Sequence, residues 1–265
     1  MPETCQRHSK RWINGGAHAL LVDHDVRGQH TTVCLIRKAD AAELLRARTG
    51  GGADRRGLLR YGALTPAARS ELDWLCARLD WPRDRHDAAP RMHRDPDWLQ
   101  GLEVPPEVLA TYRPPRQREP VELLEAGRDM QGRPLWLTDA AGRAWRRLAA
   151  AARADGIGLF AVSGFRSAAY QHRLIARKRA RGQSWEQILA VSALPGYSEH
   201  HLGTTLDLHA GDGPALEECF EHTQAFAWLQ AQAGRFGFRL SYPRDNSHGI
   251  AYEPWHWRFH DPSGV

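Results

Sequence analysis

Apolar residues occur along this chain only in short runs, and this limits what the chain can fold into. One of the longest candidates, Ala17–Val22, is interrupted by His18 and is far too short for a helix that crosses a bilayer, which needs about 20 apolar residues. Hydrophobic residues still make up 42% of the 265 residues and charged residues 25%, the proportions of a chain with a packed core. We therefore expect a folded protein without a transmembrane segment, in one or two domains.

The first part of the chain is expected to contain a hairpin and a helix. His18–Val22 and Thr31–Ile36 are rich in β-prone residues, and Gly28 lies in the polar segment that connects them. Thr65-Pro66 offers an N-cap and a first-turn proline for a helix that runs to about Leu79.

A domain border is expected near residue 116. The segment 81–120 is rich in Pro, Asp and Arg, which is typical of a linker or an irregular wrap. We therefore assign residues 1–116 to an N-terminal extension of helices and strands, and residues 117–265 to a second domain. The extension is expected to be a layer that covers the second domain, with a wall-binding or partner-binding module as the alternative.

The second domain alternates short strands with helices, which predicts an α+β fold. Thr138 can cap a helix that runs through Ala152 and stops near Gly156, and Ser167 and Ser184 can cap two more. A further helix is expected at 214–233, and short strands are expected at 159–162, 203–209, 238–242 and 255–259. The strand at 159–162 is expected to be buried. No internal repeat interrupts this order.

Charge and cysteine usage exclude two classes of function. The formal net charge is +5, but the basic residues are scattered among 31 acidic ones. The one dense basic stretch, 173–181, is typical of a solvated helix face, so we expect no nucleic-acid partner. The four cysteines lie far apart with no CxxC, which argues against a cysteine-rich zinc site. Cys34 and Cys76 lie among apolar residues and are expected to be buried thiols.

Histidines cluster toward the end of the chain. Half of the 14 lie between positions 200 and 260: His200, His201, His209, His222, His248, His256 and His260. A catalytic zinc site needs three protein ligands and one open position for water. His200 and Asp207 are a candidate pair, His256 is a candidate third ligand, and Glu253 could take a proton from the water. By spacing alone, hydrogen-bonding histidines without a metal remain the alternative.

Three blocks of residues resemble the zinc D-alanyl-D-alanine carboxypeptidases, in the LAS group of metallopeptidases. Ser198–Asp207 is similar to the family motif S-x-H-x-x-G-x-A-x-D, and Glu253–His256 matches E-x-W-H. Ser163–Gln171 is similar to the family segment S-G-[FY]-R-S with a Gln five residues after the Arg. The resemblance begins near Gly127, and the first 116 residues resemble no family. It implies a small antiparallel sheet with flanking helices.

The resemblance also implies roles for single residues. The Zn²⁺ ligands would be His200, Asp207 and His256. Glu253 would be the general base. Arg166 would stabilise the oxyanion or hold the terminal carboxylate of the substrate, with Gln171, Ser198 and Trp255 as further substrate contacts. The implied substrate is a peptidoglycan stem peptide or muropeptide that loses its C-terminal D-Ala.

One residue departs from the family pattern, and the remaining histidines are expected outside the ligand set. Thr205 occupies the position of a small Ala in the motif, and we expect catalysis to survive this change. We expect His201 to be a polar neighbour, because three ligands already complete a catalytic zinc site. His209 would support the site from the strand face that it shares with Asp207. His248 and His260 are expected to be structural or solvent-facing.

The residues leave several functions open. An L,D-carboxypeptidase, a D,D-dipeptidase or a phage-type endolysin could use the same zinc centre, because specificity depends on the pocket walls. A non-catalytic zinc-binding module is disfavoured because Glu253 and Arg166 are both present. The family resemblance points to the cell envelope, but the first 20 residues show no signal peptide, so a cytoplasmic enzyme is the alternative. Protein partners are not predicted.

Overall fold

The computed structural model describes residues 10–24, 31–49, 64–78 and 97–261. The chain divides into two compact units: residues 1–97 with 121–124, and residues 98–120 with 125–265. The predicted border near residue 116 lies inside the first segment of the second unit. Among the described residues, no helix has both the length and the apolar character needed to cross a membrane.

The first unit contains an antiparallel sheet and one helix. Its elements are β1 (Lys10–Asn14), β2 (His18–His24), β3 (Thr31–Arg37), β4 (Ala42–Thr49) and α1 (Pro66–Arg78). The strands follow the order β4-β3-β2-β1, and the start of β5 (Glu122–Arg128) pairs with β1. The predicted hairpin is confirmed, because β2 and β3 pair with Leu20 opposite Leu35. Gly28 and Leu79 lie outside the described residues.

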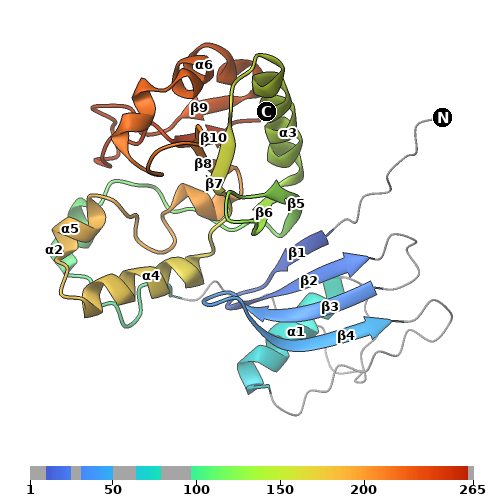
Figure 1. The fold of residues 1–265 in the computed structure, drawn as a ribbon. Helices are drawn as coiled ribbons and strands as arrows, with labels where there is room; N and C mark the ends of the chain where they lie inside the picture. Colours follow the sequence, from blue (N-terminus) through green and yellow to red (C-terminus); the bar gives the residue numbers. More distant parts are fainter. Residues whose placement is uncertain (1–9, 25–30, 50–63, 79–96, 262–265) are drawn as a thin grey trace, which may run out of the picture. The chain divides into compact units, whose positions relative to one another are not determined.

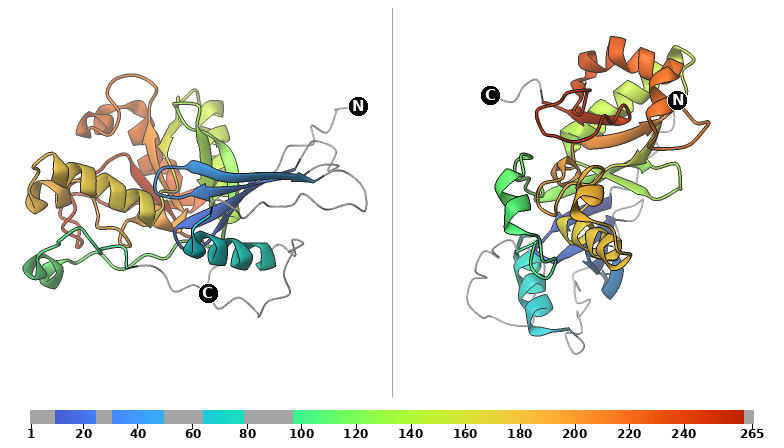
Figure 2. Two further views of the ribbon diagram at one scale, coloured as in Figure 1. Left: turned by 90° about the horizontal axis from the view of Figure 1, so that it is seen from below. Right: turned by 90° about the vertical axis from the view of Figure 1, so that its left-hand side faces the viewer.

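Helix α1 packs on one face of this sheet, as the left view of Figure 2 shows. It begins where the sequence predicts, since the Thr65 hydroxyl accepts a hydrogen bond from the Ala68 N–H at 3.2 Å. Its buried Leu72 and Leu75 belong to one core cluster with Leu20 of the sheet. Cys34 and Cys76 are buried free thiols, which confirms that prediction.

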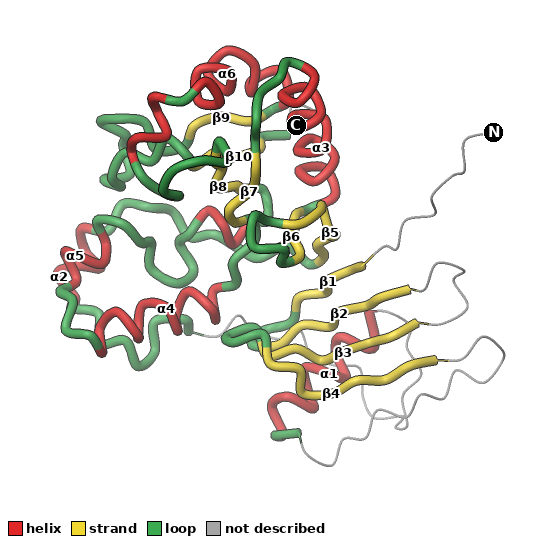
Figure 3. Tube along the Cα trace, in the orientation of Figure 1, coloured by secondary structure: helices red, strands yellow, loops and turns green. Residues whose placement is uncertain are grey.

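The second unit holds a four-stranded antiparallel sheet with helices around it (Figures 1 and 3). Its elements after β5 are β6 (Pro134–Leu137), α3 (Asp139–Ala154), β7 (Phe160–Ser163), α4 (Ala168–Ala180), α5 (Trp185–Leu189), η2 (Glu199–Leu202), β8 (Thr205–His209), η3 (Glu218–His222), α6 (Gln224–Gln232), η4 (Ala233–Phe236), β9 (Phe238–Leu240) and β10 (His256–Phe259). α2 (Pro106–Thr111) precedes them. The strand order is β7-β8-β10-β9, so the predicted α+β class is confirmed.

The helices of this unit begin at the predicted capping residues. The side chains of Thr138 and Ser167 accept backbone N–H bonds at the starts of α3 and α4. At Ser184 the full capping box is present, because the Gln187 side chain also accepts the Ser184 N–H. Each of these bonds closes within four residues, which is why the sequence alone predicts them.

Strand β8 lies at the centre of the second unit's core. All five of its residues are buried. Leu206 and Leu208 belong to the core cluster that also contains Leu148 of α3, Leu229 of α6 and Trp257 of β10. The opposite face of β8 carries polar side chains, since successive residues of a strand point to opposite faces. The leucines therefore hold the strand in place while its polar face is available for chemistry.

Three expectations about the elements are wrong in detail. The helix predicted at 214–233 is divided into η3 and α6, because Thr223 is extended and its side chain accepts the Phe226 N–H as a cap. The predicted buried strand at 159–162 is an edge strand, where Phe160 is 47% exposed. The segment 81–120 contains the short helix α2.

Candidate metal centre

The turn between η2 and β8 places His200 beside the sheet. η2 ends at Gly203, whose φ of +63° is left-handed and favours glycine. The Gly203 carbonyl accepts a hydrogen bond from the Thr138 N–H at 2.9 Å, which fixes the turn against the start of α3. The chain then reverses into β8, so His200 and Asp207 lie close together although six residues separate them.

The pairing of β8 with β10 brings the third side chain to the same place. Asp207 lies directly opposite His256 in the antiparallel register. Side chains that are directly opposite in an antiparallel pair lie on one face of the sheet. His256 therefore reaches Asp207 from a position 49 residues later in the chain.

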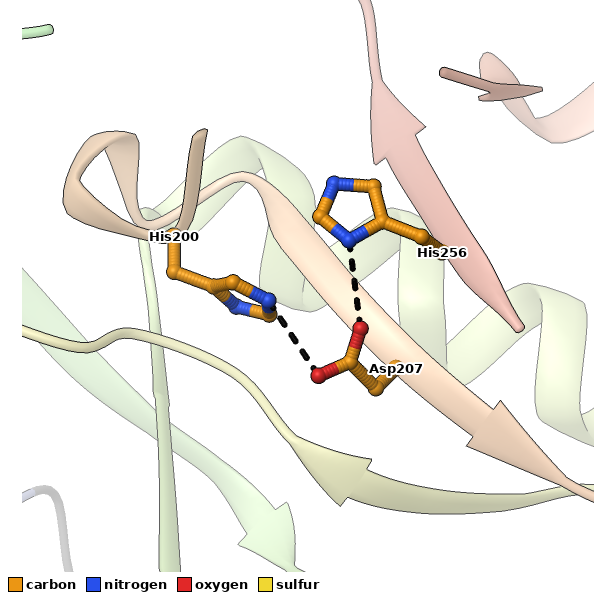
Figure 4. A group of neighbouring side chains, drawn as sticks. All are labelled: His200, Asp207 and His256. Carbon is orange, nitrogen blue, oxygen red and sulfur yellow. Dashed lines mark hydrogen bonds and ion pairs between the residues drawn. The ribbon is translucent and has the colours of Figure 1, made fainter. Parts of the chain in front are cut away.

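His200, Asp207 and His256 form a buried group with the spacing of metal ligands (Figure 4). His200 Nε2 lies 3.2 Å from Asp207 Oδ2, and His256 Nδ1 lies 3.2 Å from Asp207 Oδ1. Ligand atoms on a tetrahedral zinc ion, with bonds of 2.0–2.1 Å, lie roughly 3.3 Å apart. One ligand atom from each residue lies within 4.8 Å of the others. The donor set and its spacing therefore fit Zn²⁺.

Hydrogen bonds on the outer side of each imidazole orient the ligand atoms inward. His200 Nδ1–H donates to the Gly164 carbonyl at 2.7 Å, which leaves Nε2 facing Asp207. His256 Nε2–H donates to Glu199 at 3.2 Å, which leaves Nδ1 facing Asp207. Such outer partners select the tautomer that a metal-binding histidine needs.

Two buried carboxylates keep their negative charge at this group. Burial disfavours the charge on Asp207, but His200 and His256 outweigh it and hold the pKa of Asp207 well below its usual value. Burial also opposes the charge on Glu199, yet hydrogen bonds from His256 and Arg258 help lower its pKa to about 2. The Ser163 hydroxyl donates to Asp207 Oδ2 at 2.5 Å. The site therefore concentrates negative charge where a cation would bind.

Glu253 lies beside the group at the end of a closed loop. Its Oε2 is 3.4 Å from His256 Nδ1. The loop between β9 and β10 is closed at its base, because the Glu253 N–H donates to the Tyr242 carbonyl at 3.1 Å. Burial raises the pKa of Glu253 to about 7, although the nearby His256 opposes this. A carboxylate with a pKa near neutrality can both accept and return a proton.

The same loop is held at two further points. The Asn246 side chain donates to the carbonyls of Pro243 and Ile250 at 3.0 and 2.7 Å. Arg244 lies 4.0 Å from the centre of the Tyr252 ring, and both side chains bond to Glu221 of η3. Tyr252 directly precedes Glu253, so these contacts hold the backbone that carries the carboxylate.

Arg166 directs its guanidinium toward the group. Its Nη2 lies 3.8 Å from Asp207 Oδ2, and its Nη1 donates to Gln171 Oε1 at 3.3 Å. Gln171 is fully buried and donates to the Ala193 carbonyl at 2.7 Å, which fixes its orientation. The Arg166 side chain is 25% exposed, so part of the side chain remains accessible to a ligand. Ser198 is buried at the start of η2.

Two other residues singled out in the sequence have contacts away from the ligand atoms. Trp255 is half-buried against the apolar core, and its carbonyl accepts a hydrogen bond from the Leu208 N–H. The Thr205 hydroxyl donates to the Glu199 carbonyl at 3.1 Å and so ties η2 to β8.

The remaining histidines lie outside the ligand group. His201 is a buried polar neighbour, as expected, which bonds to the Arg166 carbonyl and accepts the Gly196 N–H. His209 accepts the Gly211 N–H, His248 contacts the Tyr242 ring, and His260 is exposed.

Two residues that support His256 were not predicted from the sequence: Glu199, which contacts it, and Arg258, which acts through Glu199. Glu199 and Arg258 are joined by a hydrogen bond of 2.8 Å, and Glu199 supports His256. Arg258 follows His256 by two residues on β10, so the period of a strand places both on one face. That alternation is the signal that could have identified Arg258. Glu199 carries no such signal, because its contact depends on how η2 packs on β10.

Comparisons with known proteins agree with the motifs. A family model described as VanY, D-alanyl-D-alanine carboxypeptidase, matches residues 134–262. The chain is 35% identical over 119 residues to a D-alanyl-D-alanine carboxypeptidase of Enterococcus faecalis, covering 41% of this chain and 42% of that protein. It is 30% identical over 160 residues to the bifunctional D-Ala-D-Ala dipeptidase and carboxypeptidase VanXYC of Enterococcus gallinarum, covering 54% of this chain and 76% of that protein. The match to the Enterococcus faecalis enzyme thus spans about two fifths of the length of that enzyme.

Among solved structures, the chain is similar to the LdcB LD-carboxypeptidase. The sequence identity is 29% and the TM-score is 0.49, and the match covers 55% of this chain and 71% of that one.

Proposed function

The chain belongs to the VanY family of D-alanyl-D-alanine carboxypeptidases, and we propose that it is a zinc-dependent enzyme that removes the C-terminal D-Ala from peptidoglycan stem peptides. The observation that carries the proposal is the buried group of His200, Asp207 and His256 with Glu253 beside it. The names of both curated relatives give D-Ala-D-Ala as the substrate, which supports this substrate class.

Zinc would be held by His200 Nε2, Asp207 and His256 Nδ1. The two nitrogens and one carboxylate are donors that Zn²⁺ prefers, and three protein ligands are typical of a catalytic site. When bound, the ion lowers the pKa of a water molecule and polarises the carbonyl of the peptide bond. Gly164 and Glu199 keep the two imidazoles in the orientation that this binding requires.

Glu253 acts as the general base and then as the general acid. Its carboxylate takes the proton from the attacking water and returns that proton to the departing amine nitrogen of D-Ala. Burial prepares the side chain for both steps, because a pKa of about 7 keeps both protonation states accessible near neutral pH. The Tyr242 carbonyl holds the Glu253 backbone at the position where this transfer occurs.

Arg166 binds the free carboxylate of the terminal residue, and Gln171, which the sequence suggested as a further substrate contact, is fully buried and positions Arg166 instead. A guanidinium offers two parallel N–H donors to a carboxylate, and Gln171 holds Arg166 from behind. A peptide that continued beyond this point would leave these donors unpaired, which is costly in a partly buried site. This recognition therefore makes the enzyme an exopeptidase.

The test is release of D-Ala from a pentapeptide that ends in D-Ala-D-Ala. We expect release that stops with a chelator, returns with zinc, and falls by about 10²–10⁴-fold in Glu253→Gln while that variant still binds one zinc per chain. Glu217→Gln is the matched control, because Glu217 is an exposed acid outside the site. We expect this control to keep wild-type activity.

A different set of cleavage products would indicate a different peptidase activity. No release from the pentapeptide by a protein that holds one zinc per chain would overturn the D,D-carboxypeptidase proposal. Cleavage of free D-Ala-D-Ala or of a tetrapeptide in its place would identify a D,D-dipeptidase or an L,D-carboxypeptidase, and cleavage only of intact cell wall would identify an endolysin.

A further inference from the structure

The loop of residues 193–197 precedes the segment that carries His200, and it is held from two sides. On one side it bonds to α4, which begins just after Arg166. On the other side it bonds to residues 112–117, which follow α2. Residues 112–117 precede position 134, where the family match begins, so the match assigns them no role.

Tyr112 and Gln171 hold opposite ends of one peptide group in this loop. The Leu194 N–H donates to the Tyr112 hydroxyl oxygen at 2.9 Å. The carbonyl of the same peptide group belongs to Ala193, and it accepts a hydrogen bond from Gln171 Nε2 at 2.7 Å. The group is trans, so its N–H and its C=O point in opposite directions. Tyr112 therefore fixes the peptide plane from one side, and Gln171 bonds to it from the other.

This peptide group determines which end of the Gln171 side chain faces Arg166. Because the Ala193 carbonyl can only accept, Gln171 turns its NH₂ group toward it. The other end of the side chain, Oε1, then accepts a hydrogen bond from Arg166 Nη1 at 3.3 Å. Gln171 is fully buried, so water does not easily replace either bond. A continuous chain of hydrogen bonds therefore joins the Tyr112 hydroxyl to the Arg166 guanidinium.

The end of the same loop holds the backbone of Arg166. The Gly196 N–H donates to His201 Nε2 at 3.1 Å, so the ring proton of His201 lies on Nδ1 and donates to the Arg166 carbonyl at 2.6 Å. The Gly196 carbonyl accepts the Gln117 N–H at 2.7 Å. Residues 112–117 therefore support Arg166 through two separate routes, one to its side chain and one to its main chain.

We propose that Tyr112 is a positioning residue for recognition of the free C-terminal carboxylate of the substrate. Its hydroxyl fixes the peptide group of Ala193 and Leu194, and this group orients Gln171. Gln171 in turn fixes the angle of the Arg166 guanidinium that receives the carboxylate. This inference rests on the proposed function, which gives Arg166 that role.

Two pentapeptides test the proposal on the zinc-loaded full chain. Both end in D-Ala-D-Ala, one with a free carboxylate and one with an uncharged C-terminal amide. For the free acid kcat and KM are measured, and for the amide the inhibition constant as a competitor of the acid. Tyr112→Phe keeps the ring and removes only the hydroxyl. We expect KM for the acid to rise about threefold to tenfold, the effect of one lost hydrogen bond, with kcat and the inhibition constant of the amide unchanged.

Two further variants separate this role from a general loss of structure. Tyr170→Phe is the matched control, because it makes the same change at a side chain that is 42% exposed, and it should keep wild-type values. Gln171→Leu removes the link between the peptide group and Arg166. Adding Tyr112→Phe to Gln171→Leu should therefore change KM by less than about twofold, since residues that act through one network are not additive.

Each outcome decides between the two proposals. A KM for the acid within about twofold of wild type in Tyr112→Phe, or an equal rise in KM and in the inhibition constant of the amide, would overturn the role of Tyr112 while D-Ala release keeps the proposed function. A fully additive loss in the double variant would also overturn it. If Gln171→Leu does not fold, the comparison of acid and amide in Tyr112→Phe decides alone.

If the wild-type protein releases no D-Ala, the proposed function fails. Calorimetry with the two peptides on the zinc-loaded protein then tests Tyr112 alone. Binding of the acid that weakens in Tyr112→Phe and persists in Tyr170→Phe, with the amide unaffected, supports the positioning role. No preference for the acid in the wild-type protein, or the same preference in Tyr112→Phe, overturns it.

Discussion

Replacing Glu199 with Gln tests whether this carboxylate selects the tautomer of His256 that binds metal. Glu199 accepts the His256 Nε2–H at 3.2 Å and also accepts a bond from Arg258 at 2.8 Å. A glutamine has nearly the same shape, but it offers one acceptor oxygen and one NH₂ group in place of two acceptor oxygens. If the oxygen stays with Arg258, the NH₂ group faces Nε2 and favours the tautomer with its proton on Nδ1.

That tautomer blocks the atom that would bind zinc. Loss of the partner that orients a metal-binding histidine typically lowers metal affinity by 10–100-fold, which is about 1.4–2.7 kcal/mol. The structure favours the upper part of this range for two reasons. Glu199 is only 7% exposed, so water cannot easily replace it. Its carboxylate also carries the negative charge that stabilises a cation beside His256.

The assay is competition for zinc between the apo-protein and a chelator of known affinity. Wild type, Glu199→Gln and the exposed control Glu217→Gln are titrated together at one pH. Urea unfolding of each metal-free protein measures how much the substitution destabilises the fold. A zinc affinity of Glu199→Gln within threefold of wild type would refute the argument that Glu199 orients His256. A folded variant with weaker binding would support it.

Three other perturbations have defined outcomes. Burial opposes a charge on His256, but hydrogen bonds to the carboxylates of Asp207 and Glu199 raise its pKa to about 10. At pH 8 zinc must therefore displace its proton, so calorimetry in two buffers should count at least one proton released, and a count near zero would contradict this. Tyr252→Phe removes the hydrogen bond to Glu221 next to Glu253, the proposed general base, so kcat should fall about threefold to tenfold with KM unchanged; wild-type kcat would argue against a positioning role. Leu208→Ala should lower the free energy of unfolding in urea by about 2–5 kcal/mol because Leu208 is fully buried, and a loss under about 1 kcal/mol would show that the core does not depend on it.

The sequence predicted local features of the fold well. The starts of α3 and α5 follow from Thr138 and Ser184, because each cap bond joins residues three positions apart. The hairpin of β2 and β3 follows from two β-prone runs with a short polar connection. These signals depend only on neighbouring residues, so no knowledge of the packed structure is needed.

Features that depend on packing were not predictable in the same way. The exposure of Phe160 depends on the position of β7 at the edge of the sheet, and strand order is not encoded locally. A threonine at position 223 is compatible with the interior of a helix and with an N-cap. Only its extended backbone conformation in the structure shows that it is the N-cap of α6. The grouping of His200 with Asp207 and His256 was suggested by the histidine cluster and supported by the motif resemblance, while the contact of Glu199 with His256 depends on residues 57 positions apart.

The closed loop between β9 and β10 has a fixed base and a more exposed tip. Its base is fixed where the Glu253 N–H donates to the Tyr242 carbonyl, while His248 and Ile250 near its tip line a pocket together with residues of α2 and α5. Exposed loop tips tolerate substitutions and insertions better than the elements that anchor them. Substitutions at the tip of this loop should therefore leave the position of Glu253, the proposed general base, unchanged.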